Sequence, residues 1–254
     1  MQLFWTIIRL NLAGELAYRA NFWLQVLQSL LSLATALAGL LVIFGHTSTL
    51  AGWSADELLA LFGVYMFIGG LIDFILQPAL QQMMNDMREG TFDFVLLKPV
   101  DAQLFVSIQR VRCWKCIDVT LGLLVLSVAL SRLGLHLTFQ DGLLFLLALL
   151  AGGAIIYSFW LLLASCVFWL VRVESMLSIF QNMYQAGRWP LTLYPAWLRL
   201  ILLFIIPVGV ATTIPVEALT GMLSMLTLLM LCASAGGMLV LARVVWRLGI
   251  RSYT

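Results

Sequence analysis

Long apolar runs alternate with short polar segments along the whole chain. The runs that carry few or no charges lie at 22–44, 58–77, 114–135, 143–170, 175–188 and 219–246. A helix needs about 20 mostly apolar residues to cross a bilayer, and most of these runs reach that length. The pattern therefore predicts an all-α polytopic membrane protein with six transmembrane helices in a single transmembrane domain, 1–254.

The first residues show a different periodicity. Within 1–19, apolar residues recur at helical spacing and polar residues lie between them. This pattern is typical of an amphipathic helix that lies in the plane of the membrane interface. We therefore expect an interfacial helix before the first span.

The longest polar connection, 78–113, contains a second amphipathic pattern. Its apolar positions are Leu80, Met83, Met84 and Met87. Their spacing predicts a short helix that follows a span closed by Pro78 and that ends at Gly90. Exposed methionines suit the groove of a partner protein. A helix lying flat on the membrane surface is the alternative, because it would have the same pattern.

A proline-rich apolar stretch occupies 189–217 and holds four of the six prolines. This stretch could be a full span or a re-entrant helical hairpin at about 195–215 with its tip near Pro207, and the distribution of basic residues favours the hairpin. Irregular backbone at membrane depth is tolerated only where protein covers it. The residues that mark this hairpin are Pro195, Trp197, Pro207 and Pro215.

Composition and charge support this topology. The chain is 63% hydrophobic and 10% charged, whereas a soluble domain has roughly 25% charged residues. Six spans and a hairpin place both termini on one side of the membrane. The basic residues then expected on that side are Arg9, Arg19, Arg88, Lys98, Arg110, Arg112, Lys115, Arg172, Arg243, Arg247 and Arg251, against Arg132, Arg188 and Arg199 on the other. The positive-inside rule therefore predicts cytoplasmic termini.

The sequence offers no catalytic constellation. It contains no nucleophile elbow, no zinc-protease motif and no phosphate-binding loop. The chain is therefore expected to be no enzyme and to hold no metal or cofactor of its own. If transport is driven by ATP, then ATP and Mg²⁺ are expected on a separate ATPase chain.

Two acids lie near the predicted cytoplasmic ends of spans. Asp73 and Asp118 could belong to a substrate or proton path, because ionisable residues within membranes are often functional. Their shallow position favours instead an ion pair with the nearby basic cluster, which comprises Arg110, Arg112 and Lys115. No acid remains at mid-span to drive a proton-coupled carrier.

Two stretches resemble signatures of one protein family. The first is REGTFDFVLLKPVD at 88–101, with its Gly, its Asp between apolar residues and its Leu-Leu-x-Pro. The second is YPAWLRLILLFIIPVGVATTIP at 194–215, a Tyr-Pro-x-Trp-Leu-Arg run followed by spaced prolines. Over nearly its whole length the chain is similar to six-span permease subunits of type-2 ABC exporters.

This resemblance implies a multi-pass subunit of the plasma (inner) membrane. It implies two cytosolic ABC ATPase subunits and a second permease chain, identical or different, as partners in the lipid bilayer, and no nucleic acid. It also implies a cytoplasmic coupling segment at 80–101 and a second contact in the loop before 175–188. The residues expected in coupling are Leu80, Met83, Met84, Met87, Arg88, Glu89, Gly90, Asp93, Lys98, Arg172 and Glu174.

The resemblance further implies that the second and fifth spans line the transport path and that the hairpin lies on the outer side. Candidate lining residues are Tyr65, Phe67, Phe74, Phe180, Asn182 and Tyr184. Their mostly apolar character suggests an amphiphilic or lipid-like cargo that leaves the cytoplasm. Two other classes remain open: a stand-alone channel or carrier, and a membrane-embedded enzyme that acts on lipid. A channel or carrier needs polar residues at mid-depth, and a membrane-embedded enzyme needs clustered catalytic groups. The sequence shows few of either.

Overall fold

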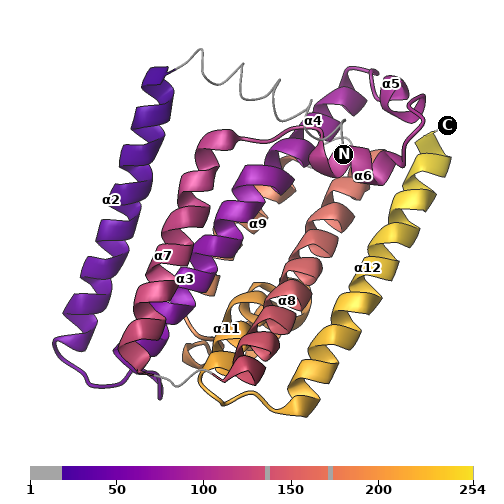
Figure 1. Cartoon of the computed structure of the whole chain (residues 1–254). Coiled ribbons are helices and arrows are strands. Elements are labelled where there is room, and N and C mark those ends of the chain that lie inside the picture. The colour runs from indigo at the N-terminus through magenta and orange to yellow at the C-terminus, as the bar shows by residue number, and fades with distance from the viewer. Residues whose placement is uncertain (1–18, 135–137, 171–173, 254) are drawn as a thin grey trace.

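The chain folds into a bundle of long helices with a small helical layer across one end (Figure 1). The computed structural model describes residues 19–134, 138–170 and 174–253. Over these residues the secondary structure is helical and contains no strand. The predicted interfacial helix, 1–19, lies outside the described residues except for Arg19, and Arg172 also lies outside them.

Within the described residues, five helical segments are long and apolar enough to cross a membrane. They comprise α2 (Arg19–Phe44), α3 (Ala55–Leu71) with η1 (Ile72–Leu76) and α4 (Gln77–Arg88), η2 (Cys113–Lys115) with α7 (Cys116–Leu133), α8 (Phe139–Ser165) with η3 (Cys166–Phe168), and α12 (Met225–Tyr253). The predicted all-α polytopic membrane fold is confirmed.

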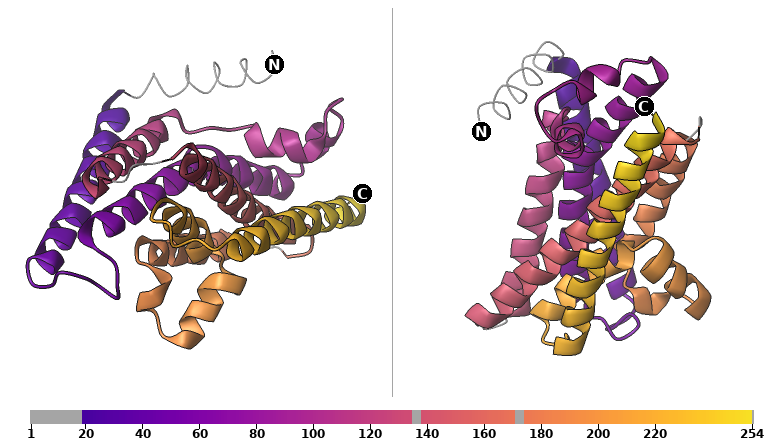
Figure 2. Two further views of the ribbon diagram at one scale, coloured as in Figure 1. Left: turned by 60° about the horizontal axis from the view of Figure 1, so that its bottom comes forward. Right: turned by 90° about the vertical axis from the view of Figure 1, so that its right-hand side faces the viewer.

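Between α8 and α12 the chain returns through shorter pieces. They are α9 (Glu174–Tyr184), η4 (Gln185–Arg188), η5 (Leu191–Leu193), α10 (Ala196–Leu200), η6 (Ile201–Ile205) and α11 (Val208–Leu219). Both α8 and α12 run towards the same end of the bundle (Figures 1 and 2), so these pieces carry the chain back to the opposite end. The predicted fifth span, 175–188, is therefore a short helix of 11 residues followed by a 3₁₀ turn, and it is not one of the full-length spans.

The proline-rich stretch forms a sharp bend. Its two helical arms, Ala196–Leu203 and Val208–Leu219, meet at 91°, and Pro207 is the N-terminal cap of α11. This bend lies at the predicted tip, and its shape fits either a re-entrant hairpin or a broken span. Pro195 caps α10, the side chain of Trp197 is exposed, and Pro215 lies inside α11.

Arg199 fastens the first arm of this hairpin to the turn before it. Its Nε donates to the carbonyl of Leu191 at 3.1 Å, and its Nη2 donates to the carbonyls of Thr192 and Tyr194 at 3.2 and 3.3 Å. The hydroxyl of Tyr194 donates to the carbonyl of Ala186 at 2.9 Å. The Tyr and Arg of the Tyr-Pro-x-Trp-Leu-Arg run thus hold together a segment whose backbone carbonyls have few helical partners.

The second long helix does not end at Pro78, so that prediction is wrong. The helix runs from Ala55 to Arg88. Pro78 has no N–H, which leaves the carbonyl of Phe74 without its helical partner. The backbone N–H of Arg112 donates to this carbonyl at 2.9 Å, and the helix widens into the π-helical turn η1 just before the proline. A donor from another segment therefore lets the helix continue.

The helices pack unequally around this long helix. α3 and α7 touch backbone to backbone, since a Cβ on Gly63 would lie 2.7 Å from the backbone nitrogen of Leu126. Close approach of this kind requires small residues at the crossing point. By contrast, no residue in the apolar window of α2 is buried, and Figure 1 shows α2 at the edge of the bundle.

Candidate functional site

A helical layer, which we call the cap, covers the end of the bundle where α12 finishes. The cap comprises α4, α5 (Asp93–Leu96) and α6 (Ala102–Ile108), and Figure 2 shows it across the ends of the long helices. The chain leaves α4 at Gly90, whose φ of +70° is a left-handed conformation that glycine adopts without strain. The end of the amphipathic helix near Gly90 is thus as predicted.

An aromatic cluster joins the cap to the bundle. Phe92 is fully buried, and its ring lies 5.6 Å from that of Tyr253 in α12 and 6.0 Å from that of Phe168 in η3. Edge-to-face pairs at these distances stabilise a contact beyond the area they bury. The first Phe of the TFDF sequence is therefore an anchor inside the protein.

A polar network provides a second attachment of the cap. Asp101 caps α6 by accepting from the backbone N–H groups of Gln103 and Leu104 at 3.0 and 3.2 Å. Arg243 of α12 forms an ion pair with Asp101 and donates to Oε1 of Gln103 at 2.7 Å. Gln103 in turn donates to the hydroxyl of Tyr157 in α8 at 3.2 Å. The hydrogen bond from Arg243 lowers the pKa of Asp101 to about 2, so the ion pair persists well into the acid range.

Two arginines hold α4 against the segment that follows α6. Arg112 donates to Oε1 of Gln81 at 2.7 Å and to Oε1 of Gln77 at 3.3 Å, and Arg110 donates to Gln82. Both arginines are predicted to pair with acids, but within the described residues they donate hydrogen bonds to the glutamines of α4. They hold the polar face of α4 against the returning chain.

The apolar stripe of α4 is buried within the chain itself. Leu80, Met83 and Met84 are at most 1% exposed, and they share a core cluster with Phe92 and Phe105. The prediction that these side chains present themselves to a partner is therefore wrong. The returning segment covers the stripe, because an amphipathic helix buries its apolar face against whatever apolar surface lies nearest. Met87 is half-buried against the same cluster.

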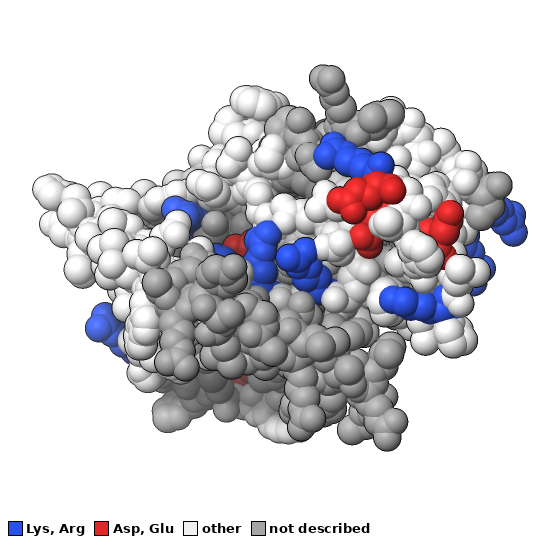
Figure 3. Space-filling view, turned by 90° about the horizontal axis from the view of Figure 1, so that it is seen from above, with Lys and Arg blue, Asp and Glu red and all other residues white. Residues whose placement is uncertain are grey.

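The outer face of the cap instead exposes a different set of apolar side chains, which we call the apolar patch. It consists of Phe94, Leu97, Val100 and Leu104, with exposed fractions of 68%, 79%, 43% and 65%. The predicted coupling residues Arg88, Glu89, Asp93 and Lys98 are exposed on the same segment. Figure 3 looks onto this end and shows basic and acidic side chains among uncharged surface.

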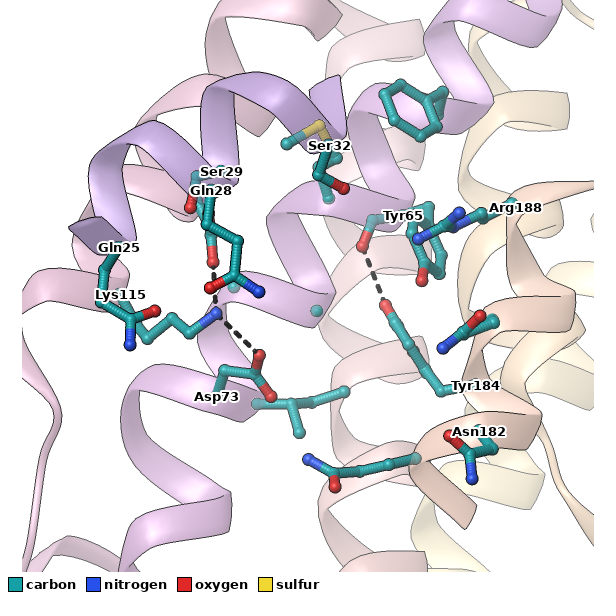
Figure 4. A pocket seen from close by; sticks show the side chains of 18 of the residues that line it. Gln25, Gln28, Ser29, Ser32, Tyr65, Asp73, Lys115, Asn182, Tyr184 and Arg188 are labelled. Atoms are coloured by element: carbon teal, nitrogen blue, oxygen red, sulfur yellow. Dashed lines mark hydrogen bonds and ion pairs between the residues drawn. The ribbon is translucent and has the colours of Figure 1, made fainter. Parts of the chain in front are cut away.

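A second feature is a pocket of about 380 Å³ between the helices, shown in Figure 4. It is lined by Gln25, Gln28, Ser29, Ser32, Phe62, Tyr65, Met66, Gly69, Gly70, Ile72, Asp73, Lys115, Asp118, Trp160, Gln181, Asn182, Tyr184, Gln185 and Arg188. These residues come from α2, α3, η1, η2, α7, α8, α9 and η4. The volume lies within the range of small-molecule sites.

Lys115 holds both acids of the pocket. Its Nζ lies 3.2 Å from a carboxylate oxygen of Asp73 and 2.8 Å from one of Asp118. The expectation that these acids pair with the neighbouring basic cluster is confirmed for Lys115. Two carboxylates on one ammonium leave this end of the pocket with one formal negative charge.

Arg188 lies at the other end of the pocket. Its guanidinium lies over the ring of Tyr65, with 5.4 Å between the guanidinium carbon and the ring centroid. Its Nε is buried and has no hydrogen-bond partner in the described residues. The sequence assigns Arg188 to the outer end of the predicted fifth span, and the structure places it in η4 beside Tyr65 of α3. The Tyr65 ring also stacks on Tyr184, whose hydroxyl donates to the carbonyl of Tyr65 at 2.9 Å.

The pocket contains half of the predicted path residues. Tyr65, Asn182 and Tyr184 line it, whereas Phe67, Phe74 and Phe180 do not. Phe180 packs edge-on against Phe159, and Phe67 lies at the contact between α3 and α7. The lining contains many amides, hydroxyls and charges, so the expected mostly apolar lining is also corrected.

Sequence reasoning missed the contribution of α2. Four of its polar residues, Gln25, Gln28, Ser29 and Ser32, line the pocket. They recur at i, i+3, i+4 and i+7, which is one face of a helix. A polar stripe on an otherwise apolar span was therefore a readable signal for a polar cavity.

A match to a family model identifies the class of protein. A family model described as ABC-2 family transporter protein matches residues 30–254. The chain belongs to the ABC-2 transporter family. Comparison with curated proteins and with solved structures gave no significant match.

Membership supports the role of a membrane permease component of an ABC transporter, in agreement with the resemblance in REGTFDFVLLKPVD and in the proline-rich stretch. The structure gives the first signature in this ABC-2 permease a physical meaning, since Gly90 turns the chain, Phe92 anchors it and Asp101 ties it to α12. Among its described residues, no group of three or more His, Cys, Asp or Glu could hold a metal ion.

Proposed function

We propose that this ABC-2 permease is the membrane subunit of an ATP-driven exporter, and that a separate cytosolic ATPase docks on the cap. The ATPase would bind the apolar patch and the charged residues around it, namely Arg88, Glu89, Asp93 and Lys98. Arg172 and Glu174, the first residue of α9, would supply the second contact. ATP and Mg²⁺ would be bound by the ATPase.

The charge distribution supports a cytoplasmic cap. The basic residues of the cap, of η2 and of the end of α12 include Arg88, Lys98, Lys115, Arg247 and Arg251. The opposite end of the bundle carries Arg132 and Arg199, and the positive-inside rule assigns the richer side to the cytoplasm. Both termini would then be cytoplasmic, and the hairpin at 195–215 would lie on the outer side of the plasma (inner) membrane.

One observation carries the mechanical part of the proposal, namely the unbroken helix from Ala55 to Arg88. Its last turns form the cap, and its middle turns place Tyr65 and Asp73 in the pocket. A force applied to the cap by an ATPase therefore acts on the pocket through one rigid element. The Phe92 cluster and the Asp101–Arg243 pair transmit the same movement to α12. Coupling by a rigid lever needs no reactive side chain.

The full assembly would contain two ATPase subunits and a second permease chain, identical or different. ATPase closure would push the two caps, and the pocket would open towards the outer side. Export is the direction that the family resemblance implies, and the proposed cargo is amphiphilic or lipid-like.

A pair of matched variants tests the docking surface. Leu97→Asp places a charge in the apolar patch, and Met222→Asp places the same charge on an exposed residue at the opposite end of the bundle, where Met222 is 61% exposed. Leu97→Asp should abolish co-purification of the P-loop ATPase and ATP-dependent transport, while Met222→Asp should leave both intact. If Leu97→Asp keeps the ATPase and Met222→Asp loses it, the docking surface lies at the end opposite the cap, and the proposal is wrong.

The pocket also favours one competing function. Asp73, Lys115 and Asp118 form a charged cluster within a polar cavity, which is a feature that a stand-alone carrier would need. Transport by the purified chain in vesicles without any ATPase, driven by an ion gradient, would support that function. Strict dependence on ATP and on the ATPase would exclude it.

A further inference from the structure

We infer that the pocket binds an anionic head group of an amphiphilic molecule, and that Arg188 is the residue that selects the negative charge. The inference names the class of cargo for the proposed function. Binding of the head group does not depend on that function, and only the assignment of the bound molecule as cargo rests on it. Four observations lead to it.

The first observation is the state of Arg188. A guanidinium has five N–H donors in a planar fork, and this one lies against the side chain of Tyr65, over its ring and within hydrogen-bonding reach of its hydroxyl. Its Nε is buried without a partner among the described residues. A charge within a membrane protein interior is normally paired. Arg188 therefore has donors and a charge available for a molecule that enters the pocket.

The second observation is that the acids of the pocket are already engaged. Asp73 and Asp118 both lie within ion-pair distance of Lys115, and within the described residues neither acid forms an ion pair with Arg188. Asp73 and Tyr65 are eight positions apart on the helix that runs through α3 and η1, which is about 12 Å along a helix axis. Arg188 beside Tyr65 thus lies deeper in the bundle than the acid–lysine cluster.

The third observation is the neutral part of the lining. The pocket is lined by the side-chain amides of Gln25, Gln28, Gln181, Asn182 and Gln185. None of these amides forms a hydrogen bond to another described residue. Amides without partners at a cavity wall are able to bind hydroxyl, amide or phosphate groups of a ligand. Together with a guanidinium fork, which matches carboxylate and phosphate geometry, they form a site for a polar anionic head.

The fourth observation concerns the apolar part of the molecule that would be bound. Phe62, Met66 and Trp160 line the same pocket, and α2 beside it is an apolar span with no buried residue in its window. A hydrocarbon tail would lie along these surfaces while the head reaches Arg188. A soluble anion would leave the apolar lining without a role, so an amphiphile fits the whole pocket better.

The test measures binding to the full chain purified in detergent, without ATPase, by native mass spectrometry. The probes are dihexanoyl phosphatidylglycerol as the anionic amphiphile, dihexanoyl phosphatidylcholine as its zwitterionic counterpart and glycerol phosphate as the head group alone. The wild-type chain should bind the anionic amphiphile about tenfold more tightly than the zwitterionic one, which is the size expected for a hydrogen bond to a charged group. Arg188→Gln should remove this preference and Arg188→Lys should keep part of it.

Two further variants keep the result interpretable. Arg132→Gln removes an exposed arginine at the outer end of α7 and should change nothing. Gln28→Leu, on the loosely packed α2, should weaken the binding of both amphiphiles about threefold, because one hydrogen bond is lost. The preference for the anionic amphiphile should stay. It tests the pocket even where Arg188→Gln fails to fold.

Three results would overturn the inference. They are equal affinity of the wild-type chain for both amphiphiles, an unchanged preference in a folded Arg188→Gln variant, and tight binding of glycerol phosphate alone, which would remove the amphiphilic assignment. Because no ATPase is present, a failure here is separable from a failure of docking, which Leu97→Asp reports.

Discussion

Truncation of Met84 tests whether the amphipathic stripe of α4 belongs to the core of the protein or to a partner surface. Met84 is 1% exposed and lies in the core cluster beneath the returning segment. Replacement of a buried methionine by alanine costs about 2–5 kcal/mol, because the lost packing leaves a cavity. For a chain of this size, a change of 1 kcal/mol shifts the melting temperature by about 2–4 °C. Met84→Ala should therefore lower the melting temperature by at least about 4 °C.

The matched control is Leu97→Ala, on the same segment but 79% exposed. Substitutions of exposed residues change stability by about 0.5 kcal/mol or less, so this variant should have nearly the melting temperature of the wild-type chain. The assay is thermal unfolding of the purified permease in detergent, followed by the loss of its monodisperse peak in size-exclusion chromatography. If Met84→Ala melts at the wild-type temperature, the stripe is not a core element and the reasoning fails. A charged substitution at Met84 would not test docking, because the cap would be lost with it.

Three further predictions address other parts of the structure. Gly63→Ala should separate α3 from α7 and destabilise the fold by about 1–3 kcal/mol, because the new Cβ would lie 2.7 Å from the backbone nitrogen of Leu126. Thermal unfolding measures this loss of stability, and an unchanged melting temperature would contradict the close contact. Arg199→Gln should speed protease cleavage within 189–200 while cleavage elsewhere stays the same, since three carbonyls lose their donor; unchanged cleavage would show that Arg199 does not hold the turn. The pKa of Asp101 is lowered to about 2, below the unfolded value of about 3.9, so its pair with Arg243 stabilises the chain above about pH 4 and is lost as the pH falls towards 2. The difference in melting temperature between the wild-type chain and Asp101→Asn should therefore shrink over that range, and a constant difference would exclude the ion pair as its cause.

The long spans could be read from the sequence because lipid leaves an apolar segment little choice but a helix. The runs that became α2, α7, α8 and α12 were predicted for this reason. Pro78 was misread, because the donor that satisfies the carbonyl of Phe74 comes from Arg112, far along the chain. The burial of Met84 was misread for a related reason, since a helical pattern defines an apolar face without naming its neighbour.

The pocket was only partly predictable. Tyr65, Asn182 and Tyr184 were candidates because they lie on two segments that the family resemblance assigned to the path. The pattern assigns Arg188 to the outer end of the predicted fifth span, because no residue there indicates that this segment is short and ends in a 3₁₀ turn beside α3. The stripe of Gln25, Gln28 and Ser32 on α2 was visible in the sequence but was not used. Its polarity on an apolar span is the feature that would have revealed the cavity.

Cross-linking at position 97 tests the central claim most directly, namely that an ATPase docks on the cap. Leu97→Cys and Met222→Cys, each in a chain whose four native cysteines are replaced by serine, would carry a short thiol-reactive cross-linker. The membranes would contain the P-loop ATPase found to co-purify with the wild-type permease. The account predicts a permease–ATPase adduct from position 97, with a yield that changes when ATP is added, and no adduct from position 222. An adduct from position 222, with none from position 97, would contradict it.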